Sequence, residues 1–334
     1  MRIKISLIIL AGRNSENLKR LFSSISQLTR LPDEILVIYD SESVNIEFTS
    51  EIEIKTKIKF IPFTGEGIQP KMRNITIKYS NSDYLWFIDD DVSLIDDSCE
   101  KLYCMVSLIH SQNNVGAIGG RIIEEKGNWK ISVKRPIDWK ATKGAVGFFN
   151  ITNEDFPIDL YEKVFTSNGK PFAIIPFTQG TNMVFRKEAL QKVNGFDEDL
   201  GVGYASFEDS DPSFALKRLG YQTIYCGEFA VIHHKMKRIA GYSRLDFNEN
   251  YNICLIRNFV ITTIKNKYPS TLKSYYNTFI FCFSSSLRFT YQMSNRKLVH
   301  TPFYFIKSIY LVFRGAIWGI NTTINSKNLR KNTI

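Results

Sequence analysis

Three consecutive carboxylates, Asp89, Asp90 and Asp91, follow directly on the apolar run Tyr84-Leu85-Trp86-Phe87-Ile88. A run of this composition predicts a buried strand, and open α/β sheets bind their ligands at the carboxyl ends of such strands. Neighbouring carboxylates repel one another unless water or a cation lies between them. Magnesium is usually held by one or two carboxylates together with substrate phosphates. The stretch therefore suggests a cation–diphosphate site, with a solvated acidic turn that caps the next helix as the alternative.

Two more polar residues stand where predicted elements end or begin. Asp40 follows a strand predicted for residues 34–39, where its carboxylate could accept a hydrogen bond from a nucleotide base. An Asx-turn after the strand is the simpler explanation. Arg73 lies near the start of a helix predicted for residues 69–79. Its guanidinium could contact a diphosphate, hold the Asp carboxylates in place or be solvated.

A second acidic group, Glu208-Asp209-Ser210-Asp211, precedes another predicted helix. The helix dipole and the free N–H groups favour carboxylates at that position, so helix capping alone accounts for the group. His233 and His234 end a predicted strand. Adjacent side chains of a strand point to opposite faces, so at most one of the two histidines is expected to be a ligand.

The elements that position these residues begin with a strand at 3–10, a helix and the strand at 34–39. Together they predict a β-α-β unit and a parallel strand pair. The helix carries apolar residues on one face, at Leu18, Leu21, Phe22 and Ile25. The loop before it has neither of the Gly-rich phosphate-binding patterns, which disfavours a dinucleotide fold or a P-loop. Residues 124–170 show no sustained period and are expected to form an irregular, acceptor-facing excursion.

Composition predicts one large domain with an appendage, or two domains, because the chain has 334 residues and 44% of them are hydrophobic. The five cysteines are scattered and lack zinc spacing, which argues for a reducing compartment and against disulfides or structural zinc. The short apolar run at residues 3–10 superficially resembles a signal peptide. A helical pattern follows at once, so we interpret it as the first strand.

The net charge of +10 is concentrated at one end of the chain. No Asp or Glu follows Glu249, whereas residues 251–334 contain twelve Lys and Arg. Such a block favours an anionic surface, either phospholipid or nucleic acid. Within it, residues 303–320 are strongly apolar and carry Lys307 and Arg314 on one helix face. This suits a helix lying in a bilayer interface, while packing on the catalytic domain or forming a dimer are the alternatives.

The order of these features resembles the family 2 inverting glycosyltransferases, which have a GT-A type nucleotide-binding fold. The resemblance covers residues 3 to about 265. Besides the strand ending in Asp40, the matching motifs are Arg73-Asn74, Phe87-Ile88-Asp89-Asp90-Asp91, Gly180-Thr181-Asn182-Met183-Val184-Phe185-Arg186, Gly195-Phe196-Asp197-Glu198, Glu208-Asp209-Ser210-Asp211 and His233.

The fold class implied by the resemblance is α/β, with a Rossmann-like, mostly parallel central sheet flanked by helices and a C-terminal helical extension. The expected catalytic domain spans residues 1–240. Its nucleotide-binding half covers about 1–122 and its acceptor half about 123–240. The basic extension, residues 241–334, is expected to associate with a membrane, which implies a cytoplasmic protein peripheral to the cytoplasmic face of the cell membrane.

The resemblance also implies roles for single residues. Asp40 would contact the nucleotide base, and Asp89 would lie near the ribose. Asp91 would bind Mg²⁺ or Mn²⁺, and His233, chosen over His234 by register, would be a further metal or diphosphate contact. The expected nucleotide-sugar-binding residues are Asp40, Arg73, Asp89, Asp90 and Asn182.

For the reaction, the resemblance implies that Asp209 is the catalytic base, with Glu208 as the weaker candidate. The donor would be a UDP- or dTDP-linked sugar. The acceptor would be a hydroxyl of a glycan or a polyprenyl-linked glycan, as in polysaccharide assembly for the cell envelope. Two rival classes are a nucleic-acid-binding protein that uses the basic block and a catalytically inactive scaffold. The aromatic and aliphatic character of the block disfavours the first, and the joint presence of Asp40, Asp89, Asp91 and Asp209 disfavours the second.

Overall fold

The computed structural model describes residues 2–12, 15–42, 44–46, 54–64, 69–111, 114–124, 173–234, 248–267, 271–293 and 301–331. The described residues fall into two compact units. Unit 1 contains the described residues up to 124 together with 173–197 and 209–234, and unit 2 contains 198–208 and 248–331. Nearly all of the excursion predicted for residues 124–170 lies outside the described residues.

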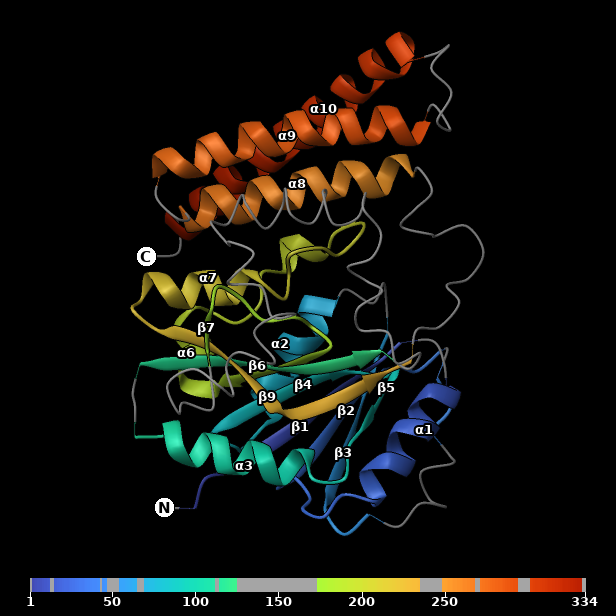
Figure 1. Cartoon of the computed structure of the whole chain (residues 1–334), viewed down its shortest axis with the longest axis vertical. Helices are drawn as coiled ribbons and strands as arrows, with labels where there is room; N and C mark the ends of the chain where they lie inside the picture. The colour runs from blue at the N-terminus through green and yellow to red at the C-terminus, as the bar shows by residue number, and fades with distance from the viewer. Residues whose placement is uncertain are drawn as a thin grey trace. The chain divides into compact units, whose positions relative to one another are not determined.

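Unit 1 is built on a mixed sheet (Figure 1), in which the described residues form nine strands in the order β3-β2-β1-β4-β8-β6-β9-β5, with β7 paired to β9. The strands are β1 (Ile5–Ala11), β2 (Glu34–Asp40), β3 (Lys57–Phe63), β4 (Tyr84–Asp89), β5 (Val92–Leu94), β6 (Val115–Glu124), β7 (Ala173–Ile175), β8 (Asn182–Arg186) and β9 (Gln222–His233).

The first four strands in this order are parallel, as the β-α-β pattern predicts. Helix α1 (Ser15–Ser26) connects β1 to β2, and α2 (Gln69–Tyr79) connects β3 to β4. The apolar face predicted for α1 is buried in full. Strand β8 is antiparallel to both of its neighbours, β4 and β6. The expected α/β fold with a flanked, largely parallel sheet is confirmed. The sheet is mixed because β8 and also β5 and β7, which both pair with β9, run antiparallel to their neighbours.

Two apolar cores lie on the two faces of this sheet. Because successive strand residues point to opposite faces, Ile5, Leu7 and Ile9 enter one core while Ile8 and Leu10 enter the other. Side chains of α1 and α3 (Ser98–Ile109) complete the first core. Side chains of α2, α6 (Lys187–Lys192) and α7 (Asp211–Arg218) complete the second. The sheet is thus covered on both faces, which leaves its strand ends as the place for polar chemistry.

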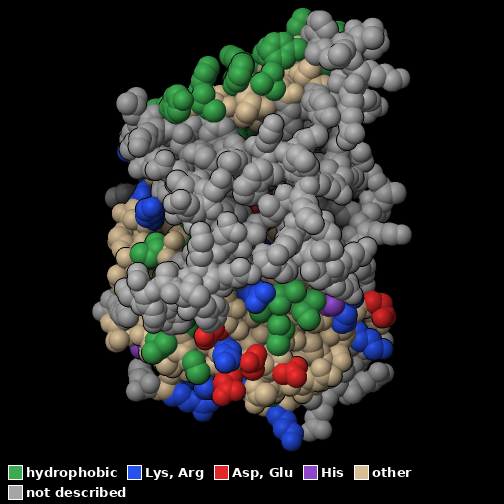
Figure 2. All heavy atoms as spheres, viewed as in Figure 1, with side chains coloured by type: hydrophobic (Ala, Val, Ile, Leu, Met, Phe, Trp, Pro, Cys, Tyr) green, Lys and Arg blue, Asp and Glu red, His purple; other side chains and the backbone are tan. Residues whose placement is uncertain are grey.

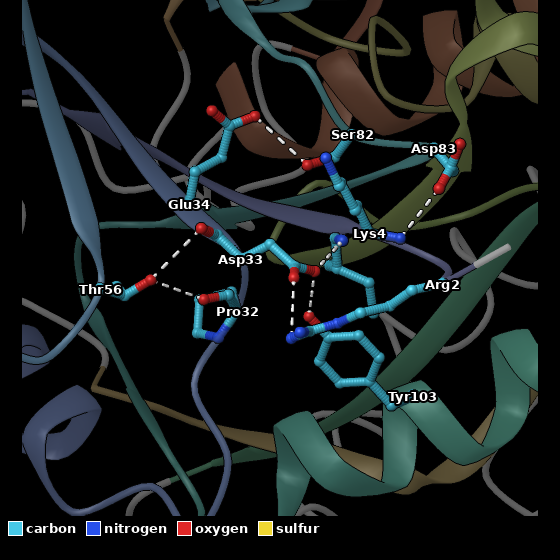
Figure 3. A network of polar contacts seen from close by, with 10 residues as sticks. Arg2, Lys4, Pro32, Asp33, Glu34, Thr56, Ser82, Asp83 and Tyr103 are labelled. Atoms are coloured by element: carbon cyan, nitrogen blue, oxygen red, sulfur yellow. Dashed lines mark hydrogen bonds and ion pairs between the residues drawn. The ribbon is translucent and has the colours of Figure 1, made fainter.

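A network of polar contacts joins the amino ends of the strands and stabilises the sheet there (Figure 3). Asp33 accepts hydrogen bonds from the backbone N–H of Ile5 at 2.8 Å and from the Tyr103 hydroxyl. Asp83 accepts one from the backbone N–H of Lys4 at 2.8 Å, and Glu34 accepts one from Ser82 at 3.3 Å. These carboxylates fasten strands to one another at the edge opposite Asp89–Asp91.

Unit 2 contains three long helices, α8 (Glu249–Asn266), α9 (Thr271–Met293) and α10 (Thr301–Lys331), with the short 3-10 helix η2 (Glu198–Gly201). Asn248 caps α8, because its side chain accepts a hydrogen bond from the backbone N–H of Tyr251 at 2.9 Å. Helix α10 packs on both α8 and α9. The predicted C-terminal helical extension is present, and α10 is longer than the apolar stretch 303–320 from which it was predicted.

Candidate active site

The carboxyl ends of three neighbouring parallel strands bring the first predicted residues together. Leu10 of β1 lies opposite Asp89 of β4, and Ala11 of β1 lies opposite Tyr39 of β2. The segments that follow, with Asp40 on one side and Asp89–Asp91 on the other, therefore flank the end of β1. Parallel strands end at one edge of a sheet, so a β-α-β arrangement suffices to make neighbours of residues that are distant in sequence.

Asp40 is the last residue of β2 and forms the Asx-turn that the sequence offered as an alternative. Its Oδ1 accepts a hydrogen bond from the backbone N–H of Glu42 at 3.1 Å. This contact fixes the direction of the carboxylate at the strand end. The residue therefore has a local role in the fold, and its expected contact with a nucleotide base stays a prediction.

Asp90 turns back onto the end of β1. Its Oδ2 accepts a hydrogen bond from the backbone N–H of Gly12 at 2.8 Å. Burial raises the pKa of Asp90 to about 7, against the lowering effect of the Gly12 hydrogen bond. The carboxylate thus fastens the turn between β4 and β5 to β1. Contact with a donor, predicted for Asp90 from the sequence, would come in addition to this internal role.

Asp89 lies at the centre of the predicted site residues. Burial raises the pKa of its carboxyl group, while the nearby Arg73 guanidinium lowers it. Asp91 raises it further, and a hydrogen bond from Thr181 and the nearness of His233 lower it. These effects place side chains from α2, from the turn after β4, from the segment before β8 and from the end of β9 around one half-buried carboxylate.

Asp91 faces His233 across the antiparallel pair β5–β9. The two side chains approach to 3.4 Å between His233 Nε2 and Asp91 Oδ2, and they are 20% and 24% exposed. His234 points elsewhere, because its Nε2 lies 2.7 Å from the Ser93 hydroxyl. Of the two adjacent histidines, His233 is therefore the one beside the carboxylate, which is the arrangement expected from the alternation of a strand.

Arg73 is buried among these groups. Only 1% of its surface is exposed, and its guanidinium carbon lies 5.3 Å from the centre of the Phe196 ring. The adjacent Asn74 holds Phe196 in place by two hydrogen bonds of 2.8 Å to its backbone N–H and C=O. The guanidinium is close enough to Asp89 to lower the pKa of its carboxyl group. Holding the Asp carboxylates in place, one of the two functional roles weighed from the sequence, therefore stays a prediction for Arg73.

Gly180 links this first group to Asp209. Its backbone N–H donates a hydrogen bond of 2.8 Å to Asp209 Oδ2. A Cβ atom added at Gly180 would lie 3.0 Å from Arg73 Nη2 and 3.5 Å from Asp209 Oδ2. Asp209 and Arg73 therefore approach Gly180 from two directions, and Arg73 also borders Asp89. Two acidic clusters that are far apart in sequence thus converge within unit 1.

Helix capping does not account for Asp209. Helix α7 starts at Asp211 after Ser210, and the Ser210 side chain forms no capping hydrogen bond. Asp209 instead accepts hydrogen bonds from Gly180 and, through Oδ1, from the Ser210 hydroxyl at 3.1 Å. The half-buried Asp209 carboxylate is thus held by groups outside the helix. Glu208 belongs to unit 2 and is only 8% exposed, and Asp211 begins α7 as expected.

Asn182 has an internal role, and the donor contact expected from the sequence stays a prediction. It is fully buried, and its Oδ1 accepts a hydrogen bond from the Trp86 indole N–H at 2.8 Å. Its Nδ2 donates to the Arg121 carbonyl at 3.0 Å and faces Gly120, where a Cβ would lie only 2.1 Å away. The amide joins β4, β6 and β8 and presents no surface to a ligand.

Sequence reasoning assigned no role to Gly180, Thr181 or Gly12. The first two lie in the motif Gly180-Thr181-Asn182, so their position was known, but their partners lie in other parts of the chain. A glycine followed by a small hydroxyl residue before a strand was the available signal. It indicates a close backbone approach without naming the group that approaches.

The residues present fit a divalent cation bound together with a diphosphate. Among the described residues there is no group of three or more His, Cys, Asp or Glu side chains able to hold a metal by themselves. Asp91 and His233 offer two adjacent ligand atoms from the protein. Such a pair suits an ion like Mg²⁺ or Mn²⁺ that takes its remaining ligands from phosphates and water.

Comparison with solved structures shows the same fold in several glycosyltransferases. The mannosyltransferase PcManGT from Pyrobaculum calidifontis, solved with GDP-Man and Mn²⁺, matches 96% of this chain and 88% of its own at 15% identity, with a TM-score of 0.53. TarS residues 1–349 from S. aureus, solved with UDP-GlcNAc, match 99% of this chain and 92% of their own at 13% identity, with a TM-score of 0.55.

A third structure, GalNAc-T7 with UDP, GalNAc and Mn²⁺, matches 78% of this chain and 47% of its own at 14% identity, with a TM-score of 0.54. At these identities the likeness establishes the fold. No curated protein matches the sequence. The family model described as Glycosyl transferase family 2 matches residues 6–193, more than half of the chain. With the sheet, the carboxylates at its edge and this match in agreement, the chain belongs to glycosyl transferase family 2.

Proposed function

We propose that this family 2 glycosyltransferase moves a sugar from a nucleoside-diphosphate donor to an acceptor hydroxyl in one displacement that inverts the anomeric carbon. The observation that carries the proposal is the approach of Arg73 and Asp209 to Gly180, since Arg73 also borders Asp89. This chain of contacts joins a candidate base to the Asp89–Asp91 group inside one unit. These contacts support the proposal that base and donor site act on one substrate.

Asp209 is the proposed general base. An acceptor hydroxyl is a poor nucleophile, so a carboxylate within hydrogen-bond reach takes its proton as the oxygen attacks. The new oxygen–carbon bond forms at the anomeric carbon while the bond to the diphosphate oxygen breaks on the opposite side, and the proton goes to Asp209. The Gly180 N–H and the Ser210 hydroxyl hold this carboxylate in orientation, and Glu208, which is more deeply buried, is the weaker candidate.

Asp91 and His233 are the proposed protein ligands of Mg²⁺ or Mn²⁺, which would neutralise charge on the departing diphosphate. Arg73 would favour the ionised form of Asp89 at the edge of the donor site, against the larger effect of burial, which raises the pKa of that carboxyl group. Two of the solved structures with this fold contain Mn²⁺ together with a nucleotide or a nucleotide sugar. The ion fits the residues of this chain for the reason given above.

The proposed donor is UDP- or dTDP-linked, with Asp40 placed at the end of β2 to meet the base. TarS with this fold is solved with UDP-GlcNAc, and PcManGT with GDP-Man, so the fold accommodates different nucleotides. The proposed acceptor is a hydroxyl of a glycan or of a polyprenyl-linked glycan, in keeping with assembly of a cell-envelope polysaccharide. An acceptor of this kind suits the basic, aromatic C-terminal helices.

The experiment that tests the function is a panel of nucleotide sugars, read by thermal shift with Mn²⁺ or Mg²⁺ present and followed by turnover assays on the donors that bind. Asp209→Asn is expected to abolish transfer while donor binding survives, because the amide accepts no proton. Asp91→Asn is expected to weaken the metal-dependent binding of UDP in calorimetry. Asp96→Asn, at an exposed carboxylate of the same unit, is the matched control. Near-normal turnover by Asp209→Asn would remove this residue from its role.

A further inference from the structure

Large hydrophobic side chains stand exposed along α9 and α10, where Figure 2 shows them gathered on one outer surface of the molecule. Aromatic side chains predominate on α9, and aliphatic ones are frequent on α10. We call this set the apolar face; it consists of Tyr275, Tyr276, Phe279, Phe283, Leu287, Phe303, Ile306, Ile309, Tyr310, Phe313, Ile317, Trp318, Ile320 and Ile324. A large group of exposed apolar side chains marks an interaction surface, because soluble proteins seldom leave one uncovered.

Helix α10 is held so that its side of the apolar face points outward. Its opposite, buried side includes Leu311 and Val312 together with two glycines, Gly315 and Gly319, that lie against α8. A Cβ at Gly315 would lie 2.8 Å from the Ile253 carbonyl oxygen, and one at Gly319 would lie 2.7 Å from that of Arg257. Such a close backbone approach leaves no room for rotation of α10 about its own axis. The exposed side chains are therefore a property of the folded unit 2.

Three side-chain contacts of α10 with its neighbouring helices support the same orientation. The Ser308 hydroxyl lies 2.8 Å from the Thr290 hydroxyl of α9, in a buried contact. Lys307 Nζ lies 3.3 Å from Glu249 Oε2 of α8. Trp318 is covered on one side by the Arg257 guanidinium, whose carbon lies 4.5 Å from the ring centre. Helix α10 is thus fixed to α8 and α9 between Lys307 and Gly319.

Charge identifies the surface that this face fits. From residue 251 to the C-terminus the chain has twelve Lys and Arg and no Asp or Glu. Lys307 and Arg314, both exposed, border the apolar stripe of α10. Apolar and aromatic side chains beside basic groups are the composition of helices that lie in the interface of a bilayer with anionic headgroups. We propose that the apolar face of α9 and α10 binds the surface of an anionic phospholipid bilayer.

A second copy of the chain, as the occupant of this face, explains less of what is seen. The exposed residues of α10 recur at alternating steps of three and four, a spacing that also suits a two-helix seam with a second copy of the chain. Arg314 flanks such a seam and would repel its equivalent, and the exposed aromatics of α9 extend well beyond a narrow seam. A planar, negatively charged surface accommodates both features.

Among the described helices, α10 is long and apolar enough to cross a bilayer between Phe303 and Asn325. Its packing argues for lying in the interface instead. To cross the bilayer, α10 would have to carry α8 with it or separate from α8 at Gly315 and Gly319. In the first case the polar side chains of Asn252, Arg257 and Asn258, which α8 buries, would enter the membrane as well. The cost of polar groups in the hydrocarbon region opposes the first, and the loss of close packing opposes the second.

The test uses the full chain and vesicles of phosphatidylglycerol with phosphatidylcholine, compared with vesicles of phosphatidylcholine alone. The variant F313S/I317S/I320S removes three side chains of the apolar face without touching the side that packs on α8. Its matched control, L108S/L219S, replaces exposed apolar residues of unit 1. We expect the wild type and the control to float with the anionic vesicles and the triple variant to bind about tenfold more weakly.

Light scattering in the absence of lipid completes the design by reporting the oligomeric state. A wild-type chain that fails to float, or that binds both kinds of vesicle equally, overturns the proposal. A dimer that the triple variant converts to a monomer, together with no flotation, assigns the face to a second copy. Donor and metal are absent from these assays, so their outcome is independent of the proposed glycosyl transfer. Equal thermal melting of the variants shows that a loss of binding does not come from unfolding.

Discussion

At the scale of single residues, the candidate site depends on a glycine. Gly180 permits its backbone N–H to reach Asp209 while Arg73 approaches from another direction. The absence of a Cβ leaves room for both neighbours, since a Cβ would lie 3.0 Å from Arg73 Nη2 and 3.5 Å from Asp209. One small residue therefore sets the separation between the candidate base and the cation that borders Asp89.

We predict that Gly180→Ala lowers kcat more than it lowers stability. The added methyl group would lie 3.0 Å from Arg73 Nη2, closer than ordinary contact, and 3.5 Å from Asp209. A shift of a few tenths of an ångström at the base is expected to lower kcat by about tenfold to a hundredfold. Steady-state kinetics and thermal melting measured on the same preparation separate the two effects. A variant with wild-type kcat would show that Gly180 does not position Asp209.

Cysteine reactivity provides a second prediction at this scale. Burial raises the pKa of Cys99 to about 12 and that of Cys226 to about 11, because the thiolate is disfavoured away from water. Cys104, by contrast, is exposed. In the native protein at mildly alkaline pH, a disulfide reagent is expected to modify Cys104 first. Mass spectrometry after a short exposure identifies the labelled residue, and early labelling of Cys99 would contradict the structure.

At the scale of secondary-structure elements, the sequence predicted the parallel half of the sheet well. The apolar run of β4 and the periodic face of α1 are local signals, and both appear in the structure as expected. The antiparallel insertion of β8 was not predicted, because five buried residues in a row do not reveal their direction or their partner. The internal contacts of Asn182, at the start of β8, were not predicted for the same reason.

The candidate site shows the same limit. Asp89, Asp91 and His233 were proposed from their types and their place at strand ends, and the structure brings these three together. The contact between Gly180 and Asp209 could not be predicted from the sequence, since it depends on how two loops pack in three dimensions. Signals carried by one element can be read from a sequence, whereas contacts between elements depend on tertiary packing.

Helix α8 offers a prediction about one of these contacts. Asn258 is fully buried, and its Nδ2 donates to the carbonyls of Leu200 at 2.8 Å and of Tyr204 and Ser206 at 3.2 Å each. Asn258→Ala leaves these buried acceptors without their donor, which is expected to lower the free energy of unfolding of unit 2 by about 2–4 kcal/mol.

Urea unfolding followed by circular dichroism measures this loss of stability. Asn250→Ala, at an exposed position of the same helix, is the matched control and is expected to change the free energy of unfolding by less than about 0.5 kcal/mol. Equal stability of the two variants would mean that Asn258 does not hold the 199–206 segment. Because that segment leads directly into Asp209, a measurement of kcat on the same variants is informative as well.

At the scale of the whole molecule, the two units divide the proposed work. The residues proposed for donor, metal and base lie in unit 1, except for Glu208, and the basic block of the chain begins in unit 2 after Glu249. Binding of donor and metal should therefore stabilise unit 1, by about 2.7 kcal/mol when the ligand is present at a hundred times its Kd. Vesicle binding should act on α9 and α10 instead.

Hydrogen exchange read by mass spectrometry can locate both effects in one protein. With a nucleotide donor and Mn²⁺, we expect slower exchange in the peptides that contain the ends of β1, β2 and β4 and the segment from Thr178 to Asn182. Those strand ends carry the residues proposed to bind the donor and the metal. Binding of the donor there suppresses the local opening motions that permit exchange. With anionic vesicles and no donor, protection should appear in α9 and α10 alone. Chelation of the metal is expected to remove the first pattern and leave the second. Donor-dependent protection confined to α9 and α10 would contradict the assignment of the site to the edge of the sheet.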